Sequence, residues 1–165
     1  MTRLDAVIER LKAQRSALGA AAQALSDTPG HILELGLGNG RTYDHLRHLF
    51  SDRKIYVFDS EIASHPDCRP DPAFLFLGPM AETLIAAAGK LGANAALVHA
   101  DIGYGDPAAT IENVRSLGPK IPALLRPGGI VLCDQSLDAV AALRSIALPA
   151  DIAPGRYHAY RRSLV

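Results

Sequence analysis

The sequence is poor in cysteine: it has two, Cys68 and Cys133, which lie far apart and form no C-x-x-C pair. This spacing excludes a disulfide framework and a zinc ribbon. The sequence also lacks net charge, because 17 basic residues offset 17 acidic ones. A nucleic-acid partner would therefore lose its main electrostatic attraction, and we expect no such partner.

Long apolar stretches are missing as well. No run reaches the roughly 20 residues that span a membrane, and residues 1–14 carry five charges where a signal peptide would be apolar. We therefore expect a cytoplasmic protein that does not associate with membranes. The 165 residues suit one domain, large enough to bury about 70% of its unfolded surface. Within it we expect residues 1–27 to form an N-terminal helix and linker, and residues 28–165 an α/β core.

The first segment, Thr2–Leu25, has the pattern of an amphipathic helix. A leucine recurs every seven residues from Leu4 onward, and Thr2 followed by Asp5 resembles a capping box. The cluster Ser26–Gly30 then ends the helix. Its apolar face must cover either the sheet or a second copy of the chain. A homodimer through this helix, or through an open face of the sheet, therefore stays an option.

A buried strand that runs into closely spaced glycines follows at His31–Gly40. Glycines occupy every second position at Gly36, Gly38 and Gly40, and a helical period begins directly after them. Glycine permits φ > 0 and lets a ligand touch the main chain. The helix N-terminus behind the turn offers unpaired N–H groups. This pattern predicts the first half of a nucleotide-type cofactor site.

The glycine spacing distinguishes two classes of cofactor. A dinucleotide site needs G-x-G-x-x-G, but Arg41 stands where the third glycine should be, and Gly40 comes one residue early. An acidic residue followed by three alternating glycines instead resembles the first motif of class I S-adenosylmethionine (SAM) dependent methyltransferases. The resemblance implies that the loop wraps the methionine part of SAM and that Glu34 lies near its amino end. A carboxylate there suits an ammonium and would repel a pyrophosphate.

A second carboxylate, Asp59, ends the next apolar strand, Lys54–Asp59, nineteen residues past Gly40. At this offset, nucleoside-binding α/β folds place an acid on the ribose hydroxyls. The resemblance implies the same role here and brings Gly78–Met80, after a short third strand, against the adenine. The residues predicted to bind SAM are Glu34, Gly36, Leu37, Gly38, Gly40, Arg41, Thr42, Asp59, Ser60, Gly78, Pro79, Met80 and Asp101.

A second motif of the same family, L-x-P-G-G, occupies Leu125–Gly129 and leads into an expected fifth strand. The resemblance implies a three-layer Rossmann-like α/β fold with a mostly parallel sheet. Three prolines in Glu61–Pro72 shorten the crossover between the second and third strands. Threefold apolar spacing predicts a helix over Leu137–Leu148, and Arg156–Arg162 is expected to form an outer strand.

The acceptor side of the site is less clearly marked. Ligands of an open α/β sheet bind beyond the carboxyl ends of the strands, which directs attention to Asp101. Asp101 and Tyr104 have the spacing of the amino-methyltransferase D-P-P-Y motif, without its prolines. Asp101 with Asp134 and Gln135 resembles the magnesium ligands of catechol-type O-methyltransferases, with Gln in place of Asn. We take Asp101 and Tyr104 as catalytic candidates, expect no metal, and interpret His99 as a hydrogen-bonded strand histidine.

These patterns predict a SAM-dependent methyltransferase that acts on a small-molecule acceptor, because the chain has no separate recognition domain. Two alternatives stay open. An NAD(P)-dependent Rossmann oxidoreductase is disfavoured by Arg41 and by the absence of a Tyr-x-x-x-Lys pair. A non-catalytic SAM-binding or dimeric module is the other.

Overall fold

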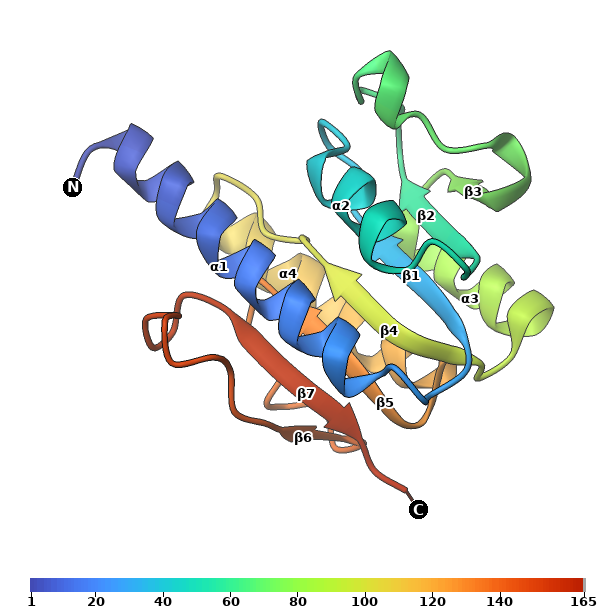
Figure 1. Cartoon of the computed structure of the whole chain (residues 1–165). Coiled ribbons are helices and arrows are strands. Elements are labelled where there is room, and N and C mark those ends of the chain that lie inside the picture. Colours follow the sequence, from blue (N-terminus) through green and yellow to red (C-terminus); the bar gives the residue numbers. More distant parts are fainter. Residues whose placement is uncertain (165) are drawn as a thin grey trace.

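The computed structural model describes residues 1–164, whose strands form one seven-stranded sheet in the order β3-β2-β1-β4-β5-β7-β6 (Figure 1). The strands are β1 His31–Leu35, β2 Ile55–Asp59, β3 Leu75–Leu77, β4 Ala95–Ala100, β5 Leu125–Cys133, β6 Leu143–Ser145 and β7 His158–Arg162. Strands β1 to β5 pair in parallel, and β7 runs antiparallel to both of its neighbours. The predicted mostly parallel α/β sheet is confirmed.

Helices cover both faces of this sheet. The α-helices are α1 Arg3–Ala24, α2 Arg41–Leu49, α3 Met80–Leu91 and α4 Pro107–Leu117, and the 3₁₀ turns are η1 Pro66–Cys68, η2 Pro72–Phe74 and η3 Gly118–Ala123. Helices α1 and α2 pack on one face, and α3 and α4 pack on the other (Figure 1). The fold therefore has three layers, as predicted. Within residues 1–164, none of the helices is both long enough and apolar enough to cross a membrane.

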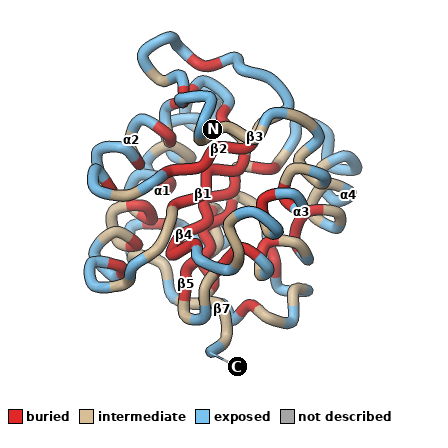
Figure 2. Tube along the Cα trace, turned by 90° about the vertical axis from the view of Figure 1, so that its right-hand side faces the viewer, coloured by how far each residue is buried: buried red, intermediate tan, exposed pale blue. Residues whose placement is uncertain are grey.

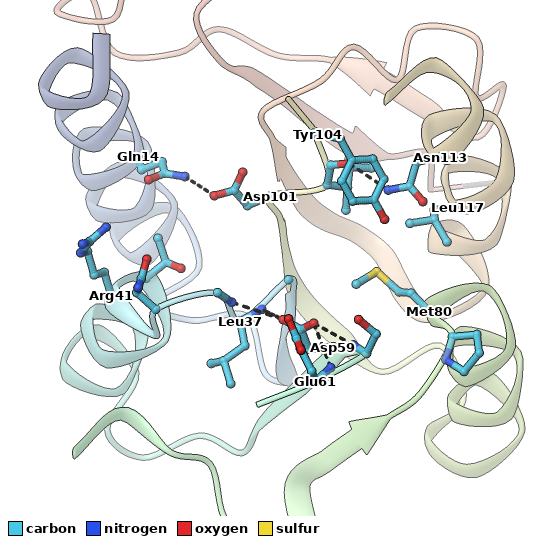
Figure 3. Close-up of a pocket in the computed structure, with 18 of the residues that line it drawn as sticks. Gln14, Leu37, Arg41, Asp59, Glu61, Met80, Asp101, Tyr104, Asn113 and Leu117 are labelled. Carbon is cyan, nitrogen blue, oxygen red and sulfur yellow. Dashed lines mark hydrogen bonds between the residues drawn. The ribbon is translucent and has the colours of Figure 1, made fainter. Parts of the chain in front are cut away.

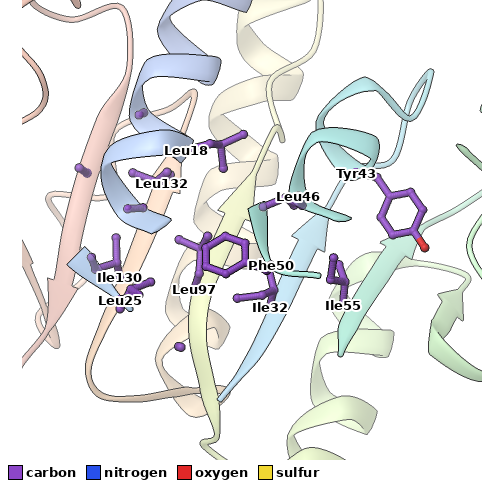
Figure 4. Close-up of a cluster of buried hydrophobic side chains, with 14 of the residues drawn as sticks. Leu18, Leu25, Ile32, Tyr43, Leu46, Phe50, Ile55, Leu97, Ile130 and Leu132 are labelled. Carbon is purple, nitrogen blue, oxygen red and sulfur yellow. The ribbon is translucent and has the colours of Figure 1, made fainter. Parts of the chain in front are cut away.

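The period of two along each strand divides the core into two clusters. Ile32 packs with α1 and α2 (Figure 4), whereas Leu33 and Leu35 pack with α3 and α4. All six residues of β4 are buried, as expected for a strand covered on both faces. Figure 2 shows the buried residues concentrated along β1, β4 and β5 in the centre of the molecule.

The N-terminal helix matches its predicted bounds and cap. The Asp5 carboxylate accepts a hydrogen bond from the Thr2 backbone N–H at 2.9 Å, and the Thr2 hydroxyl accepts one from the Asp5 N–H at 3.1 Å. Only the second half of its apolar stripe is buried: Leu18 lies in the core, but Leu4 is 68% exposed. The second half of α1 covers the sheet, and the first half extends beyond it (Figure 1).

The helix predicted over Leu137–Leu148 is wrong. The segment forms turns and the short strand β6. Its apolar side chains serve opposite faces of the sheet, because Val140 and Leu143 pack with α3 and α4 while Ile146 packs with α1 and α2. The apolar stripe of one helix cannot contact both faces of the sheet. An edge strand can, because its successive side chains point to opposite faces.

Two further expectations concern the sheet edges. The Arg156–Arg162 segment is a strand but not the outer one, because β7 is paired on both sides and β6 forms the edge. The proline-rich crossover over Glu61–Pro72 is irregular apart from 3₁₀ turns, as predicted. In the middle of the sheet, the strand order reverses between β1 and β4. Ligands of such sheets bind at this switch point.

Candidate functional site

A cavity of about 660 Å³ opens at the carboxyl ends of β1, β2 and β4, at the switch point (Figure 3). Its wall contains the predicted residues Gly36, Leu37, Gly38, Arg41, Thr42, Asp59, Ser60, Pro79, Met80, Asp101 and Tyr104. This volume lies in the range of small-molecule sites. The structure thus brings most of the residues predicted from the two motifs to one place.

The glycine loop is shaped by close backbone approach. Gly36 has φ +90°, and a Cβ there would lie 2.5 Å from the Asp101 carbonyl oxygen. Gly38 has φ +48° with no atom within 4 Å of an added Cβ, so its backbone borders the open cavity. Gly40 is needed for packing instead, because its Cβ would lie 2.5 Å from the Cys68 Cβ.

Asp59 lies at the end of β2, with its carboxylate directed at the glycine loop. Its Oδ2 accepts hydrogen bonds from the backbone N–H groups of Leu37 at 2.7 Å and Gly38 at 3.2 Å (Figure 3). Its Oδ1 accepts from the N–H groups of Ser60 at 2.7 Å and Glu61 at 3.4 Å. The carboxylate is therefore fixed in the wall of the cavity, between the loops after β1 and β2.

Glu34 lies beneath the loop and has no exposed surface. Its carboxylate contacts His99 Nδ1 at 2.5 Å and accepts a hydrogen bond from the Thr42 hydroxyl, while His99 Nε2 lies 2.5 Å from the Tyr157 hydroxyl. The interpretation of His99 as a hydrogen-bonded strand residue fits this geometry. Glu34, Gly40 and Gly78 do not line the cavity, unlike the other residues predicted to bind SAM.

Electrostatics within this buried network favour a charged imidazole. Burial lowers the pKa of His99, but the Glu34 carboxylate, aided by Asp101 and Asp134, outweighs burial and raises the pKa above its usual 6.5. Burial together with the neighbouring carboxylates raises the pKa of the Tyr157 hydroxyl well above 10.0, so it stays protonated. The hydrogen bonds of His99 to Glu34 and to Tyr157 join β4 to β1 and to the segment before β7.

Sequence reasoning missed the residues that α1 contributes to the cavity, Arg10, Leu11 and Gln14. Gln14 is 2% exposed, and its Nε2 donates to Asp101 Oδ2 at 3.1 Å (Figure 3). Arg10 Nη1 lies 3.3 Å from the same oxygen. A signal was present, because Gln14 is a polar residue inside the apolar stripe between Leu11 and Leu18.

Asp101 is the carboxylate that projects into the cavity from the end of β4 (Figure 3). Only its Oδ2 has hydrogen-bond donors in residues 1–164, so Oδ1 is free to accept another. Burial and then the charge of Asp134 raise the pKa of Asp101, against the opposing effects of His99 and Arg10. Tyr104 also lines the cavity and is 63% exposed.

Asp134 and Gln135 do not join Asp101 in a metal-like cluster. The Asp134 carboxylate accepts hydrogen bonds from the backbone N–H groups of Ile102 at 2.9 Å and Gly103 at 3.0 Å, and from Gln135 Nε2 at 2.9 Å. Its oxygens are therefore used to fix the loop after β4. Among residues 1–164, no three His, Cys, Asp or Glu side chains are grouped so that they could hold a metal ion.

Comparison with known proteins identifies relatives of this chain. Residues 1–162 match the family model described as S-adenosyl-L-methionine methyltransferase. An S-adenosyl-L-methionine methyl transferase from Silicibacter pomeroyi is 40% identical over 99% of this chain and 99% of its own, with a TM-score of 0.93. None of the proteins with curated functions matches.

More distant structures share the fold alone. The 1,6-didemethyltoxoflavin-N1-methyltransferase of Burkholderia thailandensis, solved with 1,6-didemethyltoxoflavin and S-adenosylhomocysteine, is 15% identical over 92% of this chain and 79% of its own, with a TM-score of 0.56. Human methyltransferase-like protein 13, solved with S-adenosylhomocysteine (SAH), is 15% identical over 91% of this chain and 80% of its own, with a TM-score of 0.55.

Proposed function

The chain belongs to the S-adenosyl-L-methionine methyltransferase family, and from this premise we propose that it methylates a small molecule bound beside Asp101, with SAM held in the cavity after β1, β2 and β4. The family membership decides against the NAD(P)-dependent alternative and against a module that only binds SAM. The main support for this proposal is that the glycine loop, Asp59 and Asp101, whose Oδ1 is free to accept a hydrogen bond, all line one cavity.

The chemistry of the cavity wall suits this cofactor. Asp59 offers a carboxylate where two adjacent ribose hydroxyls need an acceptor, and its longer bonds to Gly38 and Glu61 can give way to them. Gly38 leaves room for a ligand to touch the backbone. Met80 and Pro79 supply an apolar wall for the adenine. When bound, SAM would supply a methyl carbon on a sulfonium, to which the lone pair of the acceptor forms a bond while the bond to sulfur breaks and SAH leaves.

Glu34 has a supporting role in this proposal. Because it is fully buried, it acts through Thr42, which lies in the first turn of α2 and lines the cavity. Its second oxygen is held by His99. Glu34 is thus a positioning residue that fixes the start of α2 behind the cofactor loop.

Asp101 has the position of an orienting group or base for the acceptor. Arg10 and Gln14 fix its Oδ2, so Oδ1 can accept a hydrogen bond from an acceptor O–H or N–H. Fixing the nucleophile in line with the methyl group contributes up to about 7–11 kcal/mol in favourable systems. Tyr104 also lines this cavity.

Other expectations remain proposals. The basic residues of the last strand are used inside the fold, because the Arg161 and Arg162 guanidinium groups donate to the carbonyls of Gly128 and Leu125. This use supports the expectation that no nucleic acid binds. A homodimer through α1 is supported by its exposed Leu4. A cytoplasmic location and a single domain over 1–165 stay predictions.

The test is SAH formation by the purified full chain. SAM is incubated with panels of small molecules that carry hydroxyl, amine or acidic C–H groups, and separately with RNA and with unmethylated protein extract. We expect SAH to accumulate only with members of the small-molecule panels. SAH that forms with RNA or protein, and with no small molecule, would overturn the proposed acceptor class.

A further inference from the structure

A second cavity, of about 430 Å³, adjoins the cofactor cavity. It is bounded by Arg10, by Asp134 and Gln135 after β5, and by residues 153–156 before β7. Arg10 lines both cavities, and Gly103 in the wall of the first lies so close to Asp134 that an added Cβ would collide with it. The two cavities therefore share a wall made by Arg10, Gly103 and Asp134.

The second cavity contains unused cationic donors. Within residues 1–164, the guanidinium of Arg156 makes no ion pair and no hydrogen bond, although the side chain is only partly exposed. Arg10 is bonded only to Asp101, through Nη1. Each guanidinium has five N–H donors in a planar fork that matches a carboxylate or a phosphate.

The nearby carboxylates Asp134 and Asp101 do not accept hydrogen bonds from Arg156. Asp134 already accepts from two backbone N–H groups and from Gln135. Asp101 accepts from Arg10 and Gln14 through Oδ2 and does not bound this cavity. The N–H donors of Arg156 thus have no acceptor among the side chains that bound the cavity.

The segment that contains Arg156 is held in place by the residue that follows it. The next residue, Tyr157, is 2% exposed, and its hydroxyl lies 2.5 Å from His99 Nε2. The Arg156 N–H also donates to the Ala153 carbonyl at 3.1 Å and closes a turn. The main chain of Arg156 is therefore held in place, so that only its side chain must be ordered when a ligand binds.

We infer that the second cavity binds an oxyanion group of the methyl acceptor, a carboxylate or a phosphate, through Arg156 and Arg10. This inference rests on the proposed function, since the anchored acceptor extends past Arg10 to the cofactor cavity, where its nucleophilic atom lies beside Asp101. The acceptor is therefore a small molecule with an anionic end and a separate methylatable group.

The test titrates the full chain, saturated with SAH, with benzoate, phenyl phosphate or neutral benzamide, and follows backbone amides by NMR. We expect benzoate or phenyl phosphate to shift the amide signals of Gln135 and Gly155, and benzamide to leave them unchanged at the same concentration. The tighter of the two anions distinguishes a carboxylate from a phosphate acceptor.

Two variants sharpen the result. Arg156→Gln should weaken anion binding about tenfold or more, because it removes a charge-assisted hydrogen-bonding group. Arg144→Gln, at an exposed position on β6 outside both cavities, should leave anion binding unchanged. SAH affinity should be the same in both variants.

Three results would each contradict the anion site. The Arg156→Gln variant could bind the anions as tightly as the wild type. The chain could bind benzamide as tightly as benzoate, or the SAH-saturated chain could bind no anion. The two proposals fail differently. If SAH itself does not bind the wild-type chain, the proposed function fails. If SAH binds and the anions do not, only the anion site fails.

Discussion

The Asp59 carboxylate accepts a hydrogen bond from the backbone N–H of Leu37, with 2.7 Å between Oδ2 and N. This contact joins the end of β2 to the glycine loop after β1. The same carboxylate borders the cavity at the switch point of the sheet. One side chain thus joins the two loops that we propose to contact the cofactor.

Gly36→Ala should disrupt the cofactor loop. Its added Cβ would lie 2.5 Å from the Asp101 carbonyl oxygen, at φ +90° where L side chains are strained. We expect a loss of stability of at least about 1–3 kcal/mol and a loss of SAM binding. Denaturant unfolding and calorimetry measure both. Gly89→Ala, in α3 with open space around an added Cβ, is the matched control and should be neutral or stabilising. Similar results for the two variants would contradict the proposed role of Gly36.

His99→Leu should destabilise the fold strongly, because it leaves the fully buried Glu34 carboxylate without its main partner. We expect a cost of about 3–5 kcal/mol in denaturant unfolding. Glu34→Gln keeps an oxygen acceptor at the same place and should cost less, about 1–2 kcal/mol. If the two variants are equally stable, the hydrogen bond is not what holds this network.

Stability should also depend on pH through His99. Its native pKa is raised above 6.5, because the carboxylates outweigh burial. The folded state therefore binds this proton more tightly than the unfolded state does. The resulting stability is complete below about pH 6.5 and is lost as pH rises through the native pKa. Melting temperatures across about pH 6 to 9 should fall more for the wild type than for His99→Gln. Parallel curves would show that His99 does not titrate in this way.

Asp101→Asn separates catalysis from stability. Burial and Asp134 raise the pKa of Asp101, so its charge is costly in the fold and its replacement should change stability by less than about 1 kcal/mol. The amide oxygen can still accept from Gln14. Methyl transfer should fall about 10²-fold or more if Asp101 accepts the acceptor proton. With the wild type, the rate should rise with pH as Asp101 loses its proton. A fully active Asp101→Asn would leave only an orienting role.

Local sequence patterns predicted most of the fold, because glycine, proline and strand-end carboxylates act through the backbone near them. The strand, loop and helix around Gly36–Gly40 and the strand that ends at Asp59 were located from such signals. The Leu137–Leu148 segment failed because apolar spacing does not say which face of the sheet each side chain covers. That division depends on the pairing of β6 with β7, which is a long-range contact.

The site was predicted less completely for a similar reason. Residues next to strand ends were found, but the contributions of α1 to the cavity depend on how this helix crosses the sheet. Gln14 within an apolar stripe was the one local sign of that contact. Glu34 was predicted to lie near the amino end of the cofactor, and this stays a prediction; the structure shows its carboxylate held by Thr42 and His99 beneath the loop. No local pattern links Glu34 to His99, which lies on a different strand.

Binding of SAH to Asp59→Ala, measured by calorimetry on the full chain, tests most directly whether the cavity after β1 and β2 holds the cofactor. Asp52→Ala, at an exposed turn outside the cavity, serves as the control. We predict that Asp59→Ala weakens SAH binding about 10–100-fold, the loss of a charge-assisted hydrogen bond to the ribose, while Asp52→Ala binds like the wild type. A folded Asp59→Ala variant with wild-type SAH affinity would contradict the assignment.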